Sequence, residues 1–266
     1  MPKRFKLQDY STDYQQQTNQ LCVLVTGDVI YYKILKLIYK SRCKSLFKDK
    51  NNNYDWGAYI DNEEGIQQEI ESLLHMLQYA VCIADSLMQS FALDYYYQPY
   101  WDNDEGGRTV AGELVNKAKY DRPYTGLHQK ALNDLCEYME HFIQKHKLYK
   151  QADLIVSMPY FGHKEFDLPS YLAEELSRRF EITNASHLVK KTKATQPQKS
   201  LNTIDEKTEN MQNVFKLDSP EVFEDKAVII IDDVYRSGIT IQTLAQEIVN
   251  AGGKCLGLVG AKTIRG

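Results

Sequence analysis

Four consecutive β-branched residues, Val228-Ile229-Ile230-Ile231, constrain the fold of this chain more than any other segment. Such a run predicts a strand buried on both faces, which is typical of the centre of a parallel sheet. Other strand patterns lie at 154–157, 188–191 and 255–261, and helical patterns lie at 168–180 and 239–251. Strands that alternate with helices are typical of a parallel α/β sheet. We therefore expect the chain from Ala152 onward to form a Rossmann-like α/β domain.

The residues that follow this strand predict a ligand site. Asp232 and Asp233 come at its carboxyl end, where open α/β sheets bind their ligands. Ser237-Gly238-Ile239-Thr240 then leads into a helix, so backbone N–H groups and hydroxyls meet where the helix dipole favours an anion. Carboxylates accept hydrogen bonds from sugar hydroxyls, while the turn suits a phosphate. The pattern indicates a ribose-phosphate site; an ordinary turn with an ordinary helix cap is the alternative interpretation.

The segment from Val228 to Thr240 resembles the signature of type I phosphoribosyltransferases, which is an apolar strand, two acidic residues and a Thr/Ser-Gly-x-Thr turn. Within that superfamily the chain is similar to the ComF-like (competence protein F) branch. Residues 195–201, Thr-Gln-Pro-Gln-Lys-Ser-Leu, match a T-x-P-Q-x-x-L segment of that branch. Asn210 and Phe215 match an N-then-F pair, and Lys119-Tyr120 matches a Lys-Tyr pair ahead of the domain.

The resemblance implies a function and a set of site residues. The domain would bind phosphoribosyl pyrophosphate and transfer its phosphoribosyl group to a nitrogen acceptor, with release of pyrophosphate. Asp232 and Asp233 would orient the ribose hydroxyls, and Lys191, in a mobile hood, would act in catalysis. Mg²⁺ would be held mostly by substrate oxygens and water, with the two aspartates as indirect ligands. The implied substrate-binding residues are Val234, Tyr235, Arg236, Ser237, Gly238, Ile239, Thr240, His163 and Lys164.

Several positions depart from the family pattern. Arg236 stands where some phosphoribosyltransferases carry an acidic residue that acts on the acceptor, and arginine cannot serve as a general base at neutral pH. The loop after residues 154–157 lacks the arginines expected of the ComF-like branch, which leaves His163 and Lys164 as its cations. A plain connecting loop, and solvated lysines at 190–193, are the alternatives to a pyrophosphate loop and a hood.

The resemblance covers roughly residues 108–266, which we expect to form the phosphoribosyltransferase-like domain, and residues 1–107 lie outside it. Apolar residues recur at intervals of three and four between Glu63 and Phe91, which predicts one long helix or two joined helices. Residues 29–47 show a helical face, and Leu21 to Thr26 predicts a short strand. We expect a mainly helical region that is a candidate for binding a protein partner.

Composition excludes several classes of protein. The net charge of -4 gives no general attraction to nucleic acid. The 5 cysteines have no metal-ligand or disulfide spacing, which predicts reduced thiols. Neither a signal peptide nor an apolar run long enough to span a membrane is evident, so we expect a cytoplasmic protein.

Two functions of other classes remain open beside the transferase. The domain would bind a phosphoribosyl ligand without turnover if it is a sensor or a binding module. It would instead be an effector or accessory protein of a bacterial anti-phage system of the retron type if residues 1–107 bind a partner in such a system. The sequence does not separate these functions.

Overall fold

The main sheet of the protein is six-stranded and mostly parallel. The structure, a computed structural model, describes residues 6–51, 53–99, 106–121, 125–160, 166–192 and 214–264. The strands of this sheet, in spatial order, are β5 (Val81–Ile83), β6 (Gln89–Tyr95), β12 (Lys254–Lys262), β11 (Ala227–Tyr235), β7 (Leu154–Ser157) and β8 (Thr183–Asn184). All are parallel except β5, which pairs antiparallel with β6 at the edge. The predicted α/β parallel-sheet fold is confirmed.

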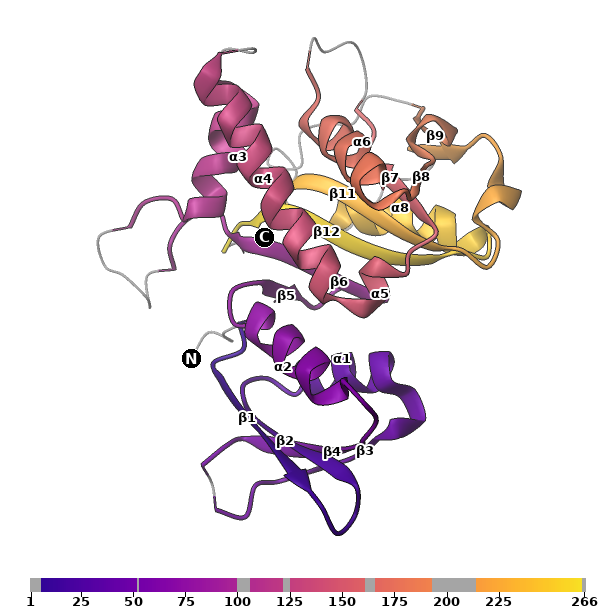
Figure 1. The fold of residues 1–266 in the computed structure, drawn as a ribbon. Coiled ribbons are helices and arrows are strands. Elements are labelled where there is room, and N and C mark those ends of the chain that lie inside the picture. Colours follow the sequence, from indigo (N-terminus) through magenta and orange to yellow (C-terminus); the bar gives the residue numbers. More distant parts are fainter. Residues whose placement is uncertain are drawn as a thin grey trace.

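Helices cover both faces of this sheet (Figure 1). One face carries α3 (Val110–Tyr120), α4 (Gly126–Lys145), the short α5 (Lys147–Lys150) and α6 (Leu168–Phe180). The other face carries α8 (Ile239–Asn250) and the hairpin of β9 (Val189–Lys191) and β10 (Phe215–Leu217), with short turns at η2 (Ser186–Leu188) and η4 (Pro220–Phe223). Ile229 and Ile231 of β11 enter the first core, and Val228 and Ile230 enter the second. The central strand is therefore buried on both faces, as its sequence predicts.

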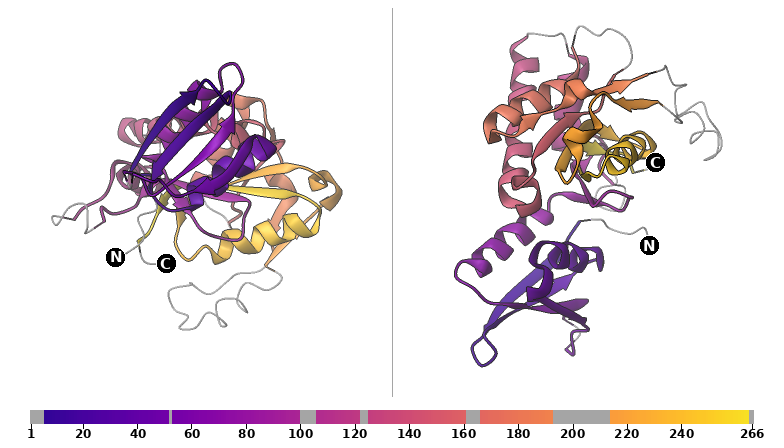
Figure 2. Two further views of the ribbon diagram at one scale, coloured as in Figure 1. Left: turned by 90° about the horizontal axis from the view of Figure 1, so that it is seen from below. Right: turned by 90° about the vertical axis from the view of Figure 1, so that its right-hand side faces the viewer.

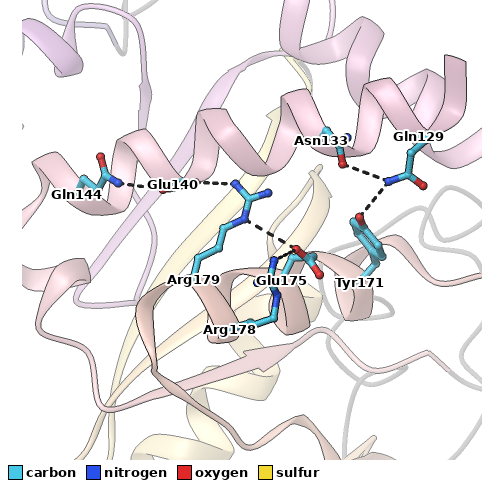
Figure 3. A network of polar contacts seen from close by, with 8 residues as sticks. All are labelled: Gln129, Asn133, Glu140, Gln144, Tyr171, Glu175, Arg178 and Arg179. Atoms are coloured by element: carbon cyan, nitrogen blue, oxygen red, sulfur yellow. Dashed lines mark hydrogen bonds and ion pairs between the residues drawn. The ribbon is translucent and has the colours of Figure 1, made fainter. Parts of the chain in front are cut away.

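Side-chain caps and polar contacts fix the helices of the first face. Thr109, Thr125 and Asp167 accept hydrogen bonds from the N–H groups of Gly112, His128 and Ser170 and so begin α3, α4 and α6. Figure 3 shows the polar contacts that join α4 to α6. Arg179 of α6 donates to Glu140 of α4 at 2.6 Å. Arg179 lies in the last turn of α6, so this contact fixes the carboxyl end of the helix against α4.

The region before the main sheet is a mixed α/β unit, so the prediction of a mainly helical region was wrong. It contains an antiparallel sheet of β1 (Asp9–Gln15), β2 (Gln20–Thr26), β4 (Trp56–Asp61) and β3 (Cys43–Phe47), in that spatial order. The helices are α1 (Ile30–Tyr39), η1 (Lys40–Arg42) and α2 (Ile66–Leu77), and they lie between this sheet and the main sheet (Figures 1 and 2). Strand β1 is mostly polar, and none of its residues is fully buried. It forms a strand because it pairs with β2, and the spacing of apolar residues along the sequence gives no sign of this pairing.

The helical pattern expected between Glu63 and Phe91 also ends early. Only α2 is helical, and the residues after Leu77 form β5 and β6 of the main sheet. Short apolar runs suit either a buried helix or a buried strand, and here pairing with β12, far along the sequence, decides. The domain boundary between residues 1–107 and 108–266 remains a prediction. Strands β5 and β6 precede that boundary in the sequence, although both belong to the main sheet.

One hydrophobic core joins the amino-terminal unit to the main sheet. The buried side chains of α2 and β2 belong to the same cluster as those of α4 and β11. All five cysteines are buried and unpaired, in agreement with the expected reduced thiols. Within the described ranges, the helices are too short or too polar to cross a membrane.

Candidate functional site

The candidate site lies at the carboxyl ends of two neighbouring strands whose following helices pack on opposite faces of the sheet. The chain leaves β7 for α6 on one face, and it leaves β11 for α8 on the other. Such a switch point opens a crevice at the carboxyl ends of the strands. Asp232 and Asp233 stand in this position, and the N–H of Met158, after β7, donates to the carbonyl of Ile231 at 2.8 Å. The fold thus places the predicted acidic pair where α/β sheets bind ligands.

Lys119 of α3 forms an ion pair with Asp233 at this end of the sheet. Both side chains are largely buried, with exposed fractions of 29% for Lys119 and 13% for Asp233. Burial lowers the pKa of Lys119, but the adjacent Asp233 carboxylate outweighs it, so the net pKa is raised. Sequence reasoning used Lys119 only as a marker of family resemblance. Its place in the site depends on how α3 packs across the sheet, for which the Lys-Tyr match was the only signal in the sequence.

The second carboxyl group, Asp232, adjoins this ion pair and interacts with both of its members. Its Oδ1 accepts a hydrogen bond from the N–H of Asp233 at 2.8 Å. Burial, and next the neighbouring Asp233 carboxylate, raise the pKa of Asp232, while Lys119 opposes this rise. Of the two carboxyl groups, Asp233 is therefore the one that the ion pair keeps charged, while Asp232 takes up a proton more readily.

The donor set of this pair fits Mg²⁺, which prefers carboxylate oxygens and keeps several waters. Asp232 and Asp233 supply such oxygens at the rim of the crevice. Over the ranges that the structure describes, no three His, Cys, Asp or Glu side chains converge as a metal cage. Any magnesium here would therefore take most of its ligands from the substrate and water.

The turn from Arg236 to Thr240 leaves the start of α8 open to an anion. Gly238 caps the helix with a left-handed φ of 74° and with no side-chain hydrogen bond, unlike the threonine caps of α3 and α4. The first hydrogen bond of the helix runs from the N–H of Gln242 to the carbonyl of Gly238 at 2.9 Å. Within the described part of the chain, the backbone N–H groups of Ser237, Ile239 and Thr240 have no hydrogen-bond acceptor. These groups are the orphan donors on which helix-terminal phosphate sites depend.

Side chains on either side of the turn support it rather than face a ligand. The Tyr235 hydroxyl donates to Asp85 at 3.2 Å, and a Cβ at Gly238 would overlap that hydroxyl. Burial raises the pKa of Tyr235. Val234 packs against the first core and Ile239 against the second. Any contribution of these three predicted residues to substrate binding would come from their backbone.

The remaining predicted residues are less closely placed. Arg236 is exposed and forms no ion pair with any residue in the described ranges, so its guanidinium is available to a phosphate. Lys191 lies at the end of β9, opposite Phe215, and burial lowers its pKa. His163, Lys164, the 195–201 segment and Asn210 lie outside the described residues.

Comparisons with known proteins agree with this geometry. Residues 170–260 match the phosphoribosyl transferase domain family. The chain is 30% identical over 113 residues to competence protein F of Haemophilus influenzae. That match covers 42% of this chain and 42% of the length of competence protein F. The predicted resemblance to type I phosphoribosyltransferases and to their ComF-like branch is confirmed.

A solved structure also aligns with most of the chain. It is the glutamine phosphoribosylpyrophosphate amidotransferase of B. subtilis, determined in complex with ADP and GMP. The alignment has a TM-score of 0.37 at 11% sequence identity, and it covers 91% of this chain and 46% of the amidotransferase chain.

Proposed function

We propose that this chain, which carries a domain of the type I phosphoribosyltransferase superfamily similar to the ComF-like branch, binds phosphoribosyl pyrophosphate with Mg²⁺. It would transfer the phosphoribosyl group to a nitrogen acceptor and release pyrophosphate. The observation that supports this most is the order of groups along β11 and the turn. A half-buried acidic pair is followed, a few residues later, by a helix start without a side-chain cap.

The turn would hold the 5-phosphate of the ligand. The N–H groups of Ser237, Ile239 and Thr240 would donate to its oxygens, and the dipole of α8 would add to the attraction. Gly238 allows this close approach because it has no side chain and adopts a left-handed conformation. Arg236, at the outer edge of the turn, would pair with a further phosphate oxygen.

The acidic pair would hold the sugar. Asp232 and Asp233 would accept hydrogen bonds from the ribose hydroxyls, and Lys119 would keep Asp233 ionised and correctly oriented. Both ends of the ribose phosphate are then fixed, which presents C1 to the acceptor. Magnesium, when bound, supplies positive charge that offsets the charge developing on the pyrophosphate.

The transfer would form a bond between the acceptor nitrogen and C1 while the bond from C1 to the pyrophosphate oxygen breaks. The bonding electrons leave with pyrophosphate, and the acceptor nitrogen supplies the new pair. Arg236 provides no base at its place in the turn. The acceptor would therefore attack with a lone pair that is already free, as an amine or a neutral ring nitrogen does.

A second candidate is a binding module without turnover. Arg236 in place of an acidic residue supports it, because the turn would then retain a phosphoribosyl ligand but not activate an acceptor. Ligand binding by the same residues is common to both candidates.

The test follows pyrophosphate release from phosphoribosyl pyrophosphate and Mg²⁺, with and without a panel of nucleobases, amines and cell extract. Turnover that disappears in the double variant Asp232→Asn with Asp233→Asn supports the enzyme. Asp134→Asn, which removes a carboxylate from an exposed ion pair on α4, is the matched control and should retain activity. A ligand-induced rise in melting temperature without turnover would favour the binding module. If neither occurs, the proposed site is wrong.

A further inference from the structure

The turn that leads into α8 is bonded to a distant part of the chain, the connection between β5 and β6 at residues 84–88. The Tyr235 hydroxyl donates to the Asp85 carboxylate at 3.2 Å. The Ser86 hydroxyl donates to the side-chain oxygen of Gln242, in the first turn of α8, at 3.0 Å. These contacts join residues that are 150 and 156 positions apart in the sequence. Two neighbouring residues of the connection therefore hold the turn from both of its ends.

Both of the contacted side chains lie against the glycine of the turn. A Cβ placed on Gly238 would overlap the Tyr235 hydroxyl and would lie 2.9 Å from the side-chain nitrogen of Gln242. The backbone N–H of Gln242 also donates to the Gly238 carbonyl at 2.9 Å. Glycine has more conformational freedom than any other residue, and here it adopts a left-handed φ of 74°. The packing of Tyr235 and Gln242 therefore restricts a position that is flexible by its own chemistry.

Asp85 connects Tyr235 to the β5–β6 hairpin. Its Oδ2 accepts from the Tyr235 hydroxyl, and its Oδ1 accepts from the N–H of Leu87 at 3.1 Å and from the Ser90 hydroxyl at 3.0 Å. The Tyr235 ring is buried in the second core. Burial, and next the Asp85 carboxylate, raise the pKa of Tyr235, so the hydroxyl keeps the proton that it donates. A carboxylate that is bonded through both oxygens thus fixes the end of a buried ring beside Gly238.

The direction of the backbone N–H groups decides how well such a turn binds a phosphate. The N–H groups of Ser237, Ile239 and Thr240 lie on either side of Gly238, so a change in the φ or ψ of this glycine turns them relative to one another. Donors that are already fixed toward a ligand avoid the entropy cost of being ordered when it binds. Contacts that fix Gly238 should therefore raise the affinity of the turn for phosphate.

We propose that Asp85 is a positioning residue for phosphate binding, because through Tyr235 it holds Gly238 and the N–H groups beside it in the arrangement that accepts a phosphate. This inference rests on the function proposed above, since it concerns the same turn. It makes the affinity of the turn depend on the β5–β6 hairpin, which precedes the expected boundary between residues 1–107 and 108–266.

The test is calorimetric titration of the full chain with phosphoribosyl pyrophosphate and Mg²⁺, at a temperature where every variant is folded. Tyr235→Phe removes only the hydroxyl and should weaken binding about tenfold, as expected for the loss of a hydrogen bond to a charged group. Asp85→Ala should weaken binding at least as much. The double variant should be no weaker than Asp85→Ala alone, because both changes remove the same contact.

A conservative variant and a matched control separate positioning from a general loss of stability. Asp85→Asn should keep the affinity within about threefold of wild type, because its amide can donate to the Tyr235 hydroxyl. Tyr32→Phe removes a hydroxyl that donates to the Lys44 carbonyl at 2.9 Å in the amino-terminal unit. It should lower the melting temperature as Tyr235→Phe does but leave the affinity unchanged.

The possible failures are distinguishable. If the wild-type chain binds phosphoribosyl pyrophosphate and both Tyr235→Phe and Asp85→Ala keep its affinity, the inference is overturned while the proposed function stands. Equal losses of affinity in Asp85→Asn and Asp85→Ala would also overturn it, because the contact with Tyr235 would not be the cause. Failure of the wild-type chain to bind would overturn the proposed function and this inference with it.

Discussion

Replacement of Lys119 by methionine tests whether the ion pair with Asp233 organises the site. Methionine keeps the apolar length of the side chain but removes its charge, so Asp233 and Asp232 lose a cation that interacts with both of them. The Asp233 carboxylate would then remain in a largely buried position without a partner. We expect the free energy of unfolding to fall.

The structure sets the size of this loss. Exposed ion pairs contribute roughly 0.2–1 kcal/mol, whereas breaking a fully buried pair costs about 3–5 kcal/mol. The exposed fractions of 29% for Lys119 and 13% for Asp233 place this pair between the two limits. We therefore expect a loss of about 2 kcal/mol. In a chain of 266 residues this corresponds to a fall in melting temperature of about 4–8 °C.

The assay is urea unfolding followed by circular dichroism, with thermal melting as a second measurement. Lys130→Met, which removes an exposed pair with Asp134 on α4, is the control and should change stability by about 0.5 kcal/mol or less. The double variant Lys119→Met with Asp233→Asn should recover part of the loss, with a coupling energy of at least about 1 kcal/mol. A loss no larger than that of the control, or a coupling energy near zero, would refute the reasoning.

Three further changes test other parts of the structure. Asp232→Asn should stabilise the protein relative to wild type, and this gain should grow as pH rises. The pKa of Asp232 is raised on folding, so its contribution to wild-type stability is complete below the unfolded pKa of about 3.9 and is lost as pH rises through the folded pKa. A difference in melting temperature between variant and wild type that stays constant from about pH 5 to pH 8 would contradict this. Gly238→Ala should lower the free energy of unfolding by about 1–2 kcal/mol and weaken ligand binding at least tenfold, because the residue has a left-handed φ of 74° and the added Cβ would overlap the Tyr235 hydroxyl. Calorimetric titration with phosphoribosyl pyrophosphate measures the loss of binding, and wild-type affinity would exclude a phosphate site at this turn. His146→Leu should reduce the loss of stability that the protein shows as pH falls below about 6. Burial lowers the pKa of His146 to about 3, whereas in the unfolded chain this histidine takes up its proton near pH 6.5. Melting temperatures that fall equally in variant and wild type below about pH 6 would show that other groups control acid unfolding.

The sequence alone determined the central strand and the turn after it. Val228 to Ile231, the acidic pair and the Ser237–Thr240 turn lie close together in the sequence, so the strand and the start of the helix follow from local rules. Because these residues lie close together in the sequence, short motifs were sufficient to detect the family resemblance. The open start of α8 and the position of Asp232 agree with those predictions.

Tertiary structure decided the features that depend on distant partners. Lys119 meets Asp233 only because α3 packs across the sheet, 114 residues away in sequence. Strands β5 and β6 join the main sheet through pairing with β12, and polar β1 is a strand only because β2 lies beside it. Short apolar and polar runs of this kind have no fixed local preference, so hydrogen bonding and burial between remote segments choose their structure. The same long-range contacts place α1 beside the β5–β6 hairpin, which no sequence pattern indicates.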